Sequence, residues 1–431
     1  MAQTSYMKRY ADQLLANQLD ASGAVLVEGP KWCGKTTTSQ QIAKSVLNMA
    51  DPTTLSQNLL LADAQPEVLL QGATPRLIDE WQIAPKLWDS VRFEVDNRRD
   101  FNQFILTGSN VPPKLDEISH SGTGRIARIR MRPMSLFESQ DSQGVVSLEE
   151  LFAKNELSAT PVEPKTLEEI AFLICRGGWP RSIGQSEAVA LLQARNYFDA
   201  VTELDITRVD GIDRDPQTAK QLLRSYARME SSEAKISEIA KDLSTRQDDE
   251  KSGTPSRVTV LSYLTALERI FVIEDLPAWN PNLRSKTALR TTPTRHFVDP
   301  SIASAALGVS PRGLMQDLNT MGLLFEGLCI RDLRIYAEVL DGEIFHYRDS
   351  SNLESDAVIH LRDGRFGLIE VKLGGERLIN EGAGNLIKLA NRLDTSRMGE
   401  PSFLMVLTAT GNFAYTREDG VMVVPVGALS A

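Results

Sequence analysis

The stretch Val25-Leu-Val-Glu-Gly-Pro-Lys-Trp-Cys-Gly-Lys-Thr36 decides the fold of the N-terminal part of this chain. An apolar run from Ala24 to Val27 predicts a short buried strand, and it leads into the pattern Gly-x-x-x-x-Gly-Lys-Thr. Residues 37–47 are expected to form a helix whose N-terminus faces the loop. Strand, glycine-rich loop and helix in this order predict a phosphate-binding loop, whereas a chance match in a turn would lack both flanking elements.

The residue types of this loop suit a nucleoside triphosphate with Mg²⁺. Gly29 and Gly34 allow backbone angles that turn the amides inward, the Lys35 ammonium can reach the β- and γ-phosphates, and the Thr36 hydroxyl can bind Mg²⁺. The expected nucleotide-binding residues are Gly29, Pro30, Lys31, Trp32, Cys33, Gly34, Lys35, Thr36 and Thr37.

Two adjacent acids, Asp79 and Glu80, follow the apolar run of residues 75–78. Asp79, at the end of a buried strand, is expected to hold Mg²⁺ through its water shell, and Glu80 is expected to act as the base on the attacking water. Two acids could equally end an ordinary strand at a solvated loop. Their position behind the phosphate loop favours the catalytic interpretation.

A third strand is predicted at Phe104-Ile-Leu-Thr-Gly-Ser-Asn110, which is apolar until it ends in hydroxyl and amide side chains. Thr107, Ser109 and Asn110 are the candidates for a contact with the γ-phosphate or the attacking water. A turn without a catalytic role is the alternative. Further on, four arginines alternate with apolar residues between positions 125 and 132, which predicts a strand with some arginines on a solvated face.

The order of these motifs, followed by Pro133-Met-Ser-Leu-Phe-Glu138, resembles the prokaryotic AAA-type ATPases that carry a C-terminal domain of unknown function. The segment Arg176-Gly-Gly-Trp-Pro180 is similar to a Gly-Gly-aromatic-Pro signature of that family. The resemblance implies ATP and Mg²⁺ as cofactors, a sensor 1 role for the strand end at Thr107, and a homo-oligomer, such as a hexameric ring. It also implies an arginine finger that acts in trans, with Arg125 as first choice and Arg128 as second.

Composition agrees with a multidomain cytoplasmic protein. The chain has 431 residues, of which 42% are hydrophobic and 24% are charged, so it can bury two or three cores. Its formal charge of −10 argues against a protein that is basic throughout. DNA contact would therefore need a local patch, at the arginines of 125–132 or over 241–295. No stretch approaches the roughly 20 apolar residues of a membrane span, and we expect no membrane partner.

Cysteines and histidines offer no further chemistry in the sequence. Three widely spaced cysteines suit a reducing compartment and predict neither a disulfide framework nor a metal site. The four histidines match no zinc spacing.

Turn-forming residues and changes of pattern divide the chain into four expected parts. These are an α/β AAA-type P-loop core over 1–140, a helical lid or connector over 141–210, a winged-helix-like domain over 211–300, and an α/β restriction-endonuclease-like domain over 301–431.

The third part resembles a winged helix-turn-helix. Helices are predicted at 217–228, 235–243 and 258–270, and the strands of a wing at 271–277 and 295–298. The segment between the second and third helices, 244–256, is long and charged, which departs from the tight turn of a DNA-reading module. Contact with DNA and docking of a protein partner therefore remain equal alternatives.

The last part carries a second set of chemical residues. A predicted hairpin, turning at residues 363–364, places Asp356 beside Glu370 and Lys372, which lie two apart on one face of a strand. Two carboxylates and a lysine can bind a divalent cation and activate water for attack on a phosphodiester. They resemble the PD-(D/E)xK nuclease motif, with Glu326, on a predicted helix at 322–335, as its upstream acid. A hairpin with Glu and Lys on its solvated face, or an inert binding module, are the alternatives.

These observations favour an oligomeric ATPase that remodels nucleic acid or a bound partner. Two other functions remain open: an ATP-dependent nuclease that cuts with the C-terminal residues, and a nucleotide-gated interaction switch without motor or nuclease activity.

Overall fold

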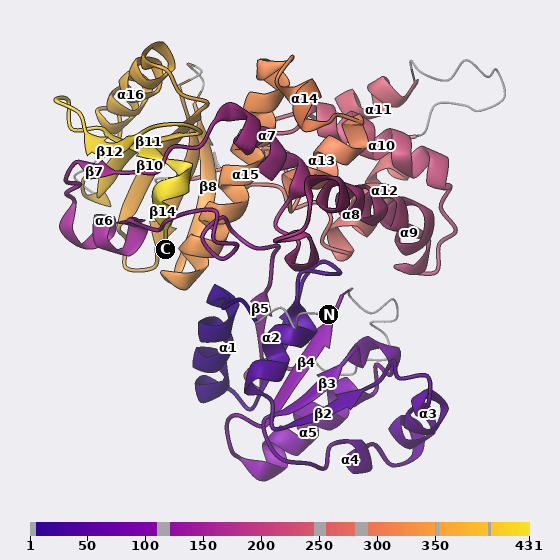
Figure 1. Cartoon of the computed structure of the whole chain (residues 1–431). Coiled ribbons are helices and arrows are strands. Elements are labelled where there is room, and N and C mark those ends of the chain that lie inside the picture. Colours follow the sequence, from indigo (N-terminus) through magenta and orange to yellow (C-terminus); the bar gives the residue numbers. More distant parts are fainter. Residues whose placement is uncertain are drawn as a thin grey trace. The chain divides into compact units, whose positions relative to one another are not determined.

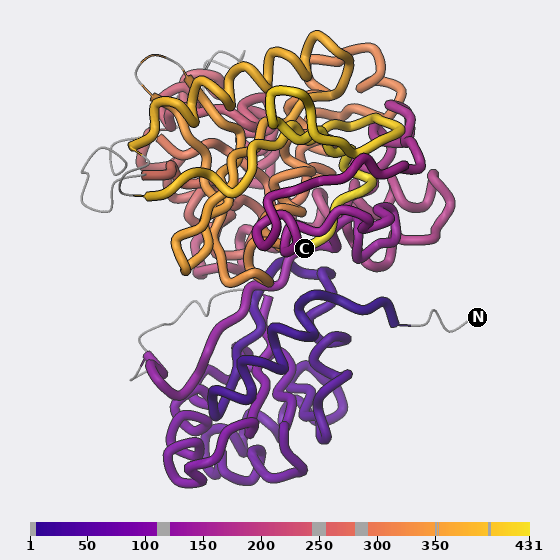
Figure 2. Tube along the Cα trace, turned by 90° about the vertical axis from the view of Figure 1, so that its left-hand side faces the viewer, coloured from indigo at the N-terminus to yellow at the C-terminus, as the bar shows by residue number. Residues whose placement is uncertain are grey.

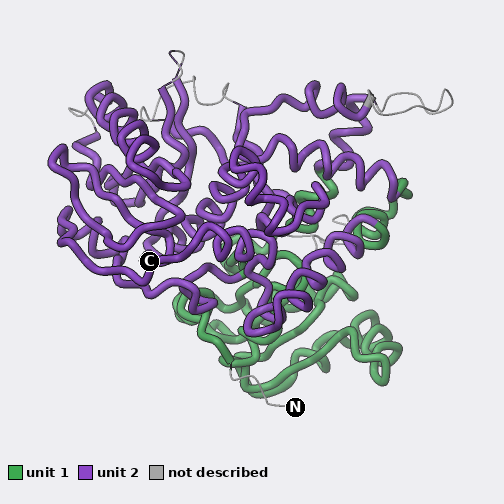
Figure 3. The backbone as a smooth tube through the Cα atoms, turned by 45° about the horizontal axis from the view of Figure 1, so that its top comes forward, with its two compact units in different colours: residues 1–133, 203–215, 265–272 green, residues 134–202, 216–264, 273–431 purple. Residues whose placement is uncertain are grey.

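The structure is a computed structural model that describes residues 6–109, 121–244, 256–280, 292–349, 351, 353–394 and 398–431, drawn in colour in Figures 1 and 2. The chain divides into two units (Figure 3). Unit 1 contains residues 1–133, 203–215 and 265–272, and unit 2 contains residues 134–202, 216–264 and 273–431.

A five-stranded parallel sheet with the strand order β2-β3-β4-β1-β5 forms the centre of unit 1 (Figure 1). Because parallel strands end at the same edge, side chains at their C-terminal ends meet there. Its strands are Ala24–Glu28 (β1), Ser45–Asn48 (β2), Arg76–Asp79 (β3), Phe104–Gly108 (β4) and Ile126–Arg130 (β5). The helices of the same region are Tyr10–Ala21 (α1), Lys35–Ile42 (α2), Leu55–Ala64 (α3), Pro66–Leu69 (α4) and Leu87–Arg98 (α5), with a 3₁₀ turn at Trp81–Ile83.

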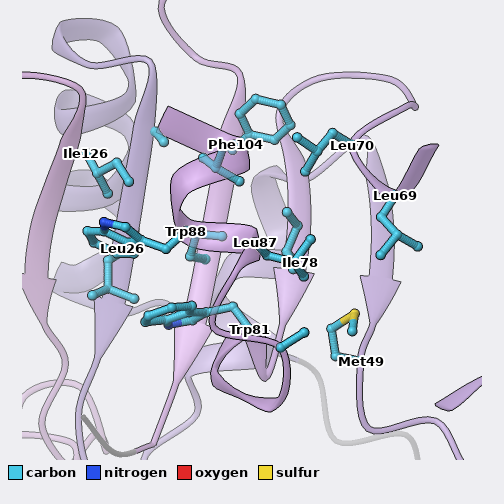
Figure 4. Packing of buried hydrophobic residues seen from close by; sticks show 14 of the residues in the cluster. Leu26, Met49, Leu69, Leu70, Ile78, Trp81, Leu87, Trp88, Phe104 and Ile126 are labelled. Carbon is cyan, nitrogen blue, oxygen red and sulfur yellow. The ribbon is translucent and has the colours of Figure 1, made fainter. Parts of the chain in front are cut away.

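Alternation along β1 supplies a core on each face of this sheet. Val25 and Val27 pack with α1 residues such as Leu15, whereas Leu26 points to the other face, where α5 provides Trp88. Figure 4 shows this second core, in which the rings of Trp81 and Trp88 lie 5.0 Å apart between centroids. Apolar residues on both faces of β1 thus bury the strand that leads into the phosphate loop.

The helix predicted over 37–47 is wrong in its second half. α2 ends at Ile42, and residues 45–48 form the edge strand β2, in which Val46 pairs with Leu77 and Asn48 with Asp79. Backbone pairing with β3 thus prevails over continuation of the helix. The predicted strands at 24–27, 75–79, 104–109 and 125–132 are present as β1, β3, β4 and β5.

In unit 2, a mixed seven-stranded sheet has the order β7-β12-β13-β11-β10-β9-β8. Its strands are Thr160–Pro161 (β7), Gly342–Arg348 (β8), Glu354–Leu361 (β9), Phe366–Lys372 (β10), Phe403–Thr408 (β11), Phe413–Thr416 (β12) and Met422–Pro425 (β13). The predicted hairpin is confirmed, because β9 and β10 pair antiparallel around a turn in which Gly364 has φ +93°. The helix Leu318–Val339 (α15) packs on β8, β9 and β10, and Glu376–Ala390 (α16) connects β10 to its parallel neighbour β11.

The expected helical connector over 141–210 needs a correction. Its first third joins the C-terminal sheet, because β7 pairs with β12, and a two-stranded sheet unites Val146–Ser147 (β6) with Leu429–Ser430 (β14). Such two-residue strands carry too little pattern to be predicted. The remainder is helical: Leu148–Lys154 (α6), Leu167–Arg176 (α7), Glu187–Ala200 (α8) with a π-helical continuation at Val201–Asp205, and Ile206–Arg208 (α9).

The Gly-Gly-Trp-Pro segment after α7 is held by close contacts of its backbone and side chains. The backbone N–H of Gly178 donates to Asp299 Oδ2 over 2.9 Å, and Trp179 Nε1 donates to Ser301 Oγ over 2.9 Å. A Cβ on Gly178 would lie 2.1 Å from the Met134 carbonyl oxygen, so only glycine fits. Within unit 2, this segment therefore contacts Met134, Asp299 and Ser301.

The predicted helices of the third part are present as Pro216–Arg228 (α10), Ile236–Ser244 (α11) and Arg257–Arg269 (α12). The wing strands predicted at 271–277 and 295–298 are reduced to two isolated antiparallel bridges, Ile273 with Phe297 and Leu276 with Thr294. Residues 245–255, between α11 and α12, lie outside the described residues. Pro300–Leu307 (α13) and Pro311–Leu314 (α14) complete unit 2. Among the described helices, none is long and apolar enough to cross a membrane.

Candidate functional site

The phosphate loop between β1 and α2 depends on its two glycines. Gly29 has φ +151°, and a Cβ there would lie 2.0 Å from the carbonyl oxygen of Met131, the residue after β5, so there is no room for a side chain. Gly34, with φ +104°, directly precedes α2. Since L-residues rarely adopt this backbone conformation, the sequence Gly-x-x-x-x-Gly is a requirement of the loop geometry.

The Lys35 side chain folds into the loop that precedes it. Its Nζ donates to the carbonyl oxygens of Gly29 over 2.8 Å and of Pro30 over 2.7 Å, and the side chain is buried. The ammonium therefore lies inside the ring of backbone that the sequence predicts to surround phosphates. Lys31, on the outer side of the loop, pairs with Asp205 over 2.5 Å.

Three residues predicted separately meet at one carboxylate oxygen. Asp79 Oδ1 accepts a hydrogen bond from Thr36 Oγ1 over 2.7 Å and another from Thr107 Oγ1 over 2.5 Å. The register explains the meeting, because Asp79 pairs with Thr107 across β3 and β4, and Val27 pairs with Thr107 across β1 and β4. Asp79 is 6% exposed. A buried carboxylate between two hydroxyls supplies the hard oxygen ligands that suit Mg²⁺. We call Thr36, Asp79 and Thr107 the Asp79 cluster.

Glu80 adopts a left-handed backbone conformation, with φ 57° and ψ 44°. Such a conformation is unusual for a non-glycine residue, and it turns the chain sharply at the end of β3. The Glu80 carboxylate accepts a hydrogen bond from the amide of Gln82, and Glu80 is half-buried. The structure thus places this carboxylate immediately after the Asp79 cluster, on a turn that a second side chain orients.

The other predicted residues of the core that the structure describes contact residues other than Asp79 or are buried. Ser109 is buried, and Asn110 lies outside the described residues. Arg125 precedes β5 and pairs with Asp96 of α5 over 2.9 Å, both side chains being more than a third exposed. Arg128 pairs with Glu28 over 3.4 Å and lies over the Trp88 ring.

A group of residues before β1, which no sequence motif marks, touches the phosphate loop. Arg9 donates from Nη1 to the Cys33 carbonyl oxygen over 2.8 Å, and the Tyr6 hydroxyl lies 2.9 Å from Thr38 Oγ1 of α2. Asp12 accepts from both the Tyr6 hydroxyl and the Arg9 backbone N–H. Burial raises the pKa of Tyr6 above its ordinary value, so the phenol stays protonated as a donor.

The four residues predicted in the C-terminal domain are brought together in unit 2. Lys372 Nζ lies 2.5 Å from Glu370 Oε2 and 3.3 Å from Asp356 Oδ2. Asp356 Oδ2 also accepts from the Val371 backbone N–H over 2.7 Å. Burial, together with the negative charge of Asp356, raises the pKa of Glu326 well above its ordinary value. We call Glu326, Asp356, Glu370 and Lys372 the C-terminal cluster.

Burial dominates the electrostatics of the C-terminal cluster. Glu370 is fully buried, and this burial together with the Asp356 charge raises its pKa to about 8. The two carboxylates raise the pKa of Lys372 above its ordinary value, although burial opposes them. Glu370 Oε1 has no hydrogen-bond partner among the described residues.

This arrangement differs from the predicted cation site in one respect. Within the described ranges, no group of three or more His, Cys, Asp or Glu side chains is placed to hold a metal ion. The physical reason lies at Lys372, whose ammonium contacts both carboxylates. A metal would have to displace that ammonium before binding both acids.

Three models of protein families match successive parts of the chain. Residues 21–140 match the family model of the AAA domain. Residues 167–313 and 321–429 match the models of two domains of unknown function, DUF8612 and DUF4143.

The individual proteins that match this chain have low sequence identity to it. An uncharacterized protein of Mycobacterium tuberculosis is 24% identical over 374 residues, which cover 85% of this chain and 74% of that protein, and an uncharacterized protein of Mycobacterium bovis matches equally. Among solved structures, a Walker-type ATPase of Pyrococcus abyssi is 13% identical over 70% of this chain and 97% of its own, with a TM-score of 0.41. The ORC2 protein of Aeropyrum pernix is 12% identical over 72% and 93%, with a TM-score of 0.31.

The residues that match the AAA domain are those that fold into β1 to β5, the phosphate loop and the Asp79 cluster. The chain therefore contains an AAA-type P-loop ATPase core.

Proposed function

We propose that this protein binds and hydrolyses ATP with Mg²⁺ in the core of unit 1. The observation that carries the proposal is the shared Asp79 oxygen, because it unites the end of the phosphate loop, at Thr36, with the ends of two strands of the sheet. In this proposal Lys35 binds the phosphates, and Thr36 binds Mg²⁺ directly while Asp79 holds it through water. Glu80 takes a proton from the attacking water, and Thr107 orients that water or the γ-phosphate. Bound Mg²⁺ supplies charge neutralisation of the phosphates.

Replacing Asp79 with asparagine is expected to raise the Mg²⁺ concentration for half-maximal ATP turnover by about 10- to 100-fold, because an amide holds the metal's water shell more weakly than a carboxylate. The measurement is phosphate release against Mg²⁺ concentration, with Asp20→Asn on the exposed end of α1 as the matched control. An unchanged Mg²⁺ dependence in Asp79→Asn would remove Asp79 from the metal site.

We further propose that the protein works in the cytoplasm as a homo-oligomer, such as a hexameric ring, with Arg125 or Arg128 reaching a neighbouring subunit's nucleotide. Both guanidinium groups are available for such a role, being 46% and 54% exposed. Arg125 is held by a surface ion pair with Asp96, a kind of pair that typically contributes about 0.2–1 kcal/mol, and by a hydrogen bond to the Thr123 carbonyl oxygen. Arg128 is held by its ion pair with Glu28 and by its contact with the Trp88 ring. A triphosphate on a second subunit can therefore compete for either arginine.

The work done by hydrolysis is proposed to be remodelling of a bound partner, protein or DNA, through the winged-helix-like part. The helix order α10, α11, α12, followed by the bridges at 273–276 and 294–297, supports that comparison. On α12, Val258 is 76% exposed and Leu261 is 38% exposed, and apolar side chains on the outer face favour a protein partner over the phosphates of DNA. Turnover stimulated by DNA would instead support the nucleic-acid alternative.

A second candidate function, cleavage of a phosphodiester, is favoured by the C-terminal cluster. The order α15, β8, β9, β10, α16, β11 agrees with the restriction-endonuclease-like fold that the motif resembles. The convergence of Asp356, Glu370 and Lys372 on that sheet supports a PD-(D/E)xK-type site.

If the C-terminal cluster cuts, Mg²⁺- or Mn²⁺-dependent plasmid nicking by the full chain should fall by about 10²-fold or more in Asp356→Ala and in Lys372→Ala. The full chain is needed because β6 and β7, from residues 146–161, complete the C-terminal sheets. Lys388→Ala, at an exposed position on α16, is the control. Nicking that survives both substitutions would assign the cleavage to another site or a contaminant.

A further inference from the structure

A buried arginine that belongs to none of the predicted motifs donates a hydrogen bond to the phosphate loop. Arg9, at the N-terminus of α1, is 7% exposed. Its Nη1 donates to the Cys33 carbonyl oxygen over 2.8 Å, and its Nη2 donates to the Arg132 carbonyl oxygen, also over 2.8 Å. One guanidinium thus joins the phosphate loop to the chain that follows β5.

The contact with the Cys33 carbonyl group also fixes the direction of the Gly34 N–H. The Cys33–Gly34 peptide is trans, and in a trans peptide the C=O and N–H bonds point in opposite directions across one rigid plane. When Arg9 holds the Cys33 oxygen, the Gly34 N–H is directed away from Arg9. That N–H belongs to the run of loop amides that a phosphate accepts.

Gly34 makes this restraint significant. With φ +104°, it occupies a region that glycine enters and leaves at little cost, so the peptide before it has few restraints of its own. The nearby Cys33 thiol offers only a weak contact, at 3.6 Å from the Met131 carbonyl oxygen. The two charge-assisted hydrogen bonds of Arg9 are stronger, because an ionised donor roughly doubles the strength of such a bond.

Arg9 is itself held in place by its neighbours. Asp12 Oδ2 accepts the Arg9 backbone N–H over 2.9 Å, and Asp12 Oδ1 accepts the Tyr6 hydroxyl over 2.5 Å. The Tyr6 oxygen also lies 2.9 Å from Thr38 Oγ1, one turn into the helix that follows the loop. Residues 6–12 therefore contact the loop at Cys33 and the helix at Thr38.

We propose that Arg9 is a positioning residue for nucleotide binding, which orients the Gly34 N–H toward the phosphates, and that Tyr6 and Asp12 support it. The inference rests on the proposed binding of ATP at the phosphate loop. It assigns to the segment before β1 a part in phosphate affinity, with Arg9 acting through the backbone and not by touching the nucleotide.

Arg9→Ala in the full chain is expected to weaken binding of a non-hydrolysable ATP analogue with Mg²⁺ by about 10- to 100-fold, because a phosphate-binding amide loses its fixed direction. Titration calorimetry measures the dissociation constant and the stoichiometry separately. A positioning role changes the dissociation constant at one nucleotide per chain, whereas partial unfolding lowers the number of nucleotides bound per total chain and leaves the dissociation constant of the folded chains unchanged. Lys8→Ala, the exposed neighbour, is the matched control and should bind as the wild type does.

Two further variants keep the test decisive if Arg9→Ala does not fold. Arg9→Lys retains a charged donor for one of the two carbonyls and should recover part of the affinity, and Tyr6→Phe should cost about 2- to 5-fold. Wild-type dissociation constants in Arg9→Ala, or in both other variants, would overturn the proposal, as would a reduced stoichiometry with unchanged affinity. A wild-type chain that binds no analogue would instead overturn the proposed function.

Discussion

Glu80→Gln is expected to bind ATP with near wild-type affinity and to hydrolyse it about 10²- to 10⁴-fold more slowly. The amide cannot take a proton from water, while the phosphate loop and the Asp79 cluster remain intact. Phosphate release under single-turnover conditions, together with fluorescence binding of a nucleotide analogue, separates the two steps. Glu67→Gln, at an exposed position on α4, is the matched control.

The geometry at Glu80 explains why this effect should be large. The left-handed conformation at φ 57° and the hydrogen bond from Gln82 hold the carboxylate in one orientation beside the Asp79 cluster. A glutamine there can keep the turn and even the contact with Gln82. Turnover equal to that of the wild type in Glu80→Gln would remove Glu80 as the base.

Arg125→Ala is expected to lower turnover by about 10³- to 10⁵-fold, which is the usual effect of an arginine finger, and the loss should be repaired in trans. Mixing Arg125→Ala subunits with Glu80→Gln subunits restores sites that take the base from one chain and the arginine from the next. At equal, random mixing, about a quarter of the sites in a closed ring are complete. Each variant alone stays inactive.

The controls for this experiment are two further variants. Arg128→Ala tests the second candidate in the same mixing assay, and Arg312→Ala removes an exposed arginine of unit 2 without an expected effect. A chain that is monomeric at every concentration and fully active would contradict the trans arrangement, as would full activity in both Arg125→Ala and Arg128→Ala.

The core and its central residues were predictable because their chemistry constrains the sequence at short range. The glycines of the phosphate loop and Lys35 stand at fixed spacing, and Asp79 follows Leu77 and Ile78 in a pattern that predicts a buried strand. Parallel strands then bring their ends together without further information. The meeting of Asp79 with Thr107 follows from strand register. Which of Thr107, Ser109 and Asn110 contacts the γ-phosphate or the attacking water stays a prediction.

The features that we did not predict depend on contacts that leave no recognisable pattern in the sequence. Arg9 binds backbone carbonyl groups at Cys33 and Arg132, and every residue carries a carbonyl. β2 was missed because Val46 and Leu47 continue a pattern that also suits a helix, and only pairing with β3 decides between them.

The C-terminal cluster shows the limit of a motif. Period-two spacing and the hairpin correctly placed Asp356, Glu370 and Lys372 together. The same spacing does not say whether the lysine stands beside a metal or in its place, since that depends on a few ångströms of side-chain position.

The central claim, that this chain hydrolyses ATP at its phosphate loop, is tested most directly by phosphate release from Mg²⁺-ATP by the full chain, measured beside a Lys35→Ala variant purified in the same way. The account predicts turnover in the wild type, and neither ATP binding nor turnover in Lys35→Ala, because the variant lacks the buried ammonium that lies against Gly29 and Pro30 and that we propose to bind the phosphates. Equal phosphate release by both proteins would contradict the claim. ATP binding by the wild type without turnover would leave a nucleotide-gated interaction switch as the function of this chain.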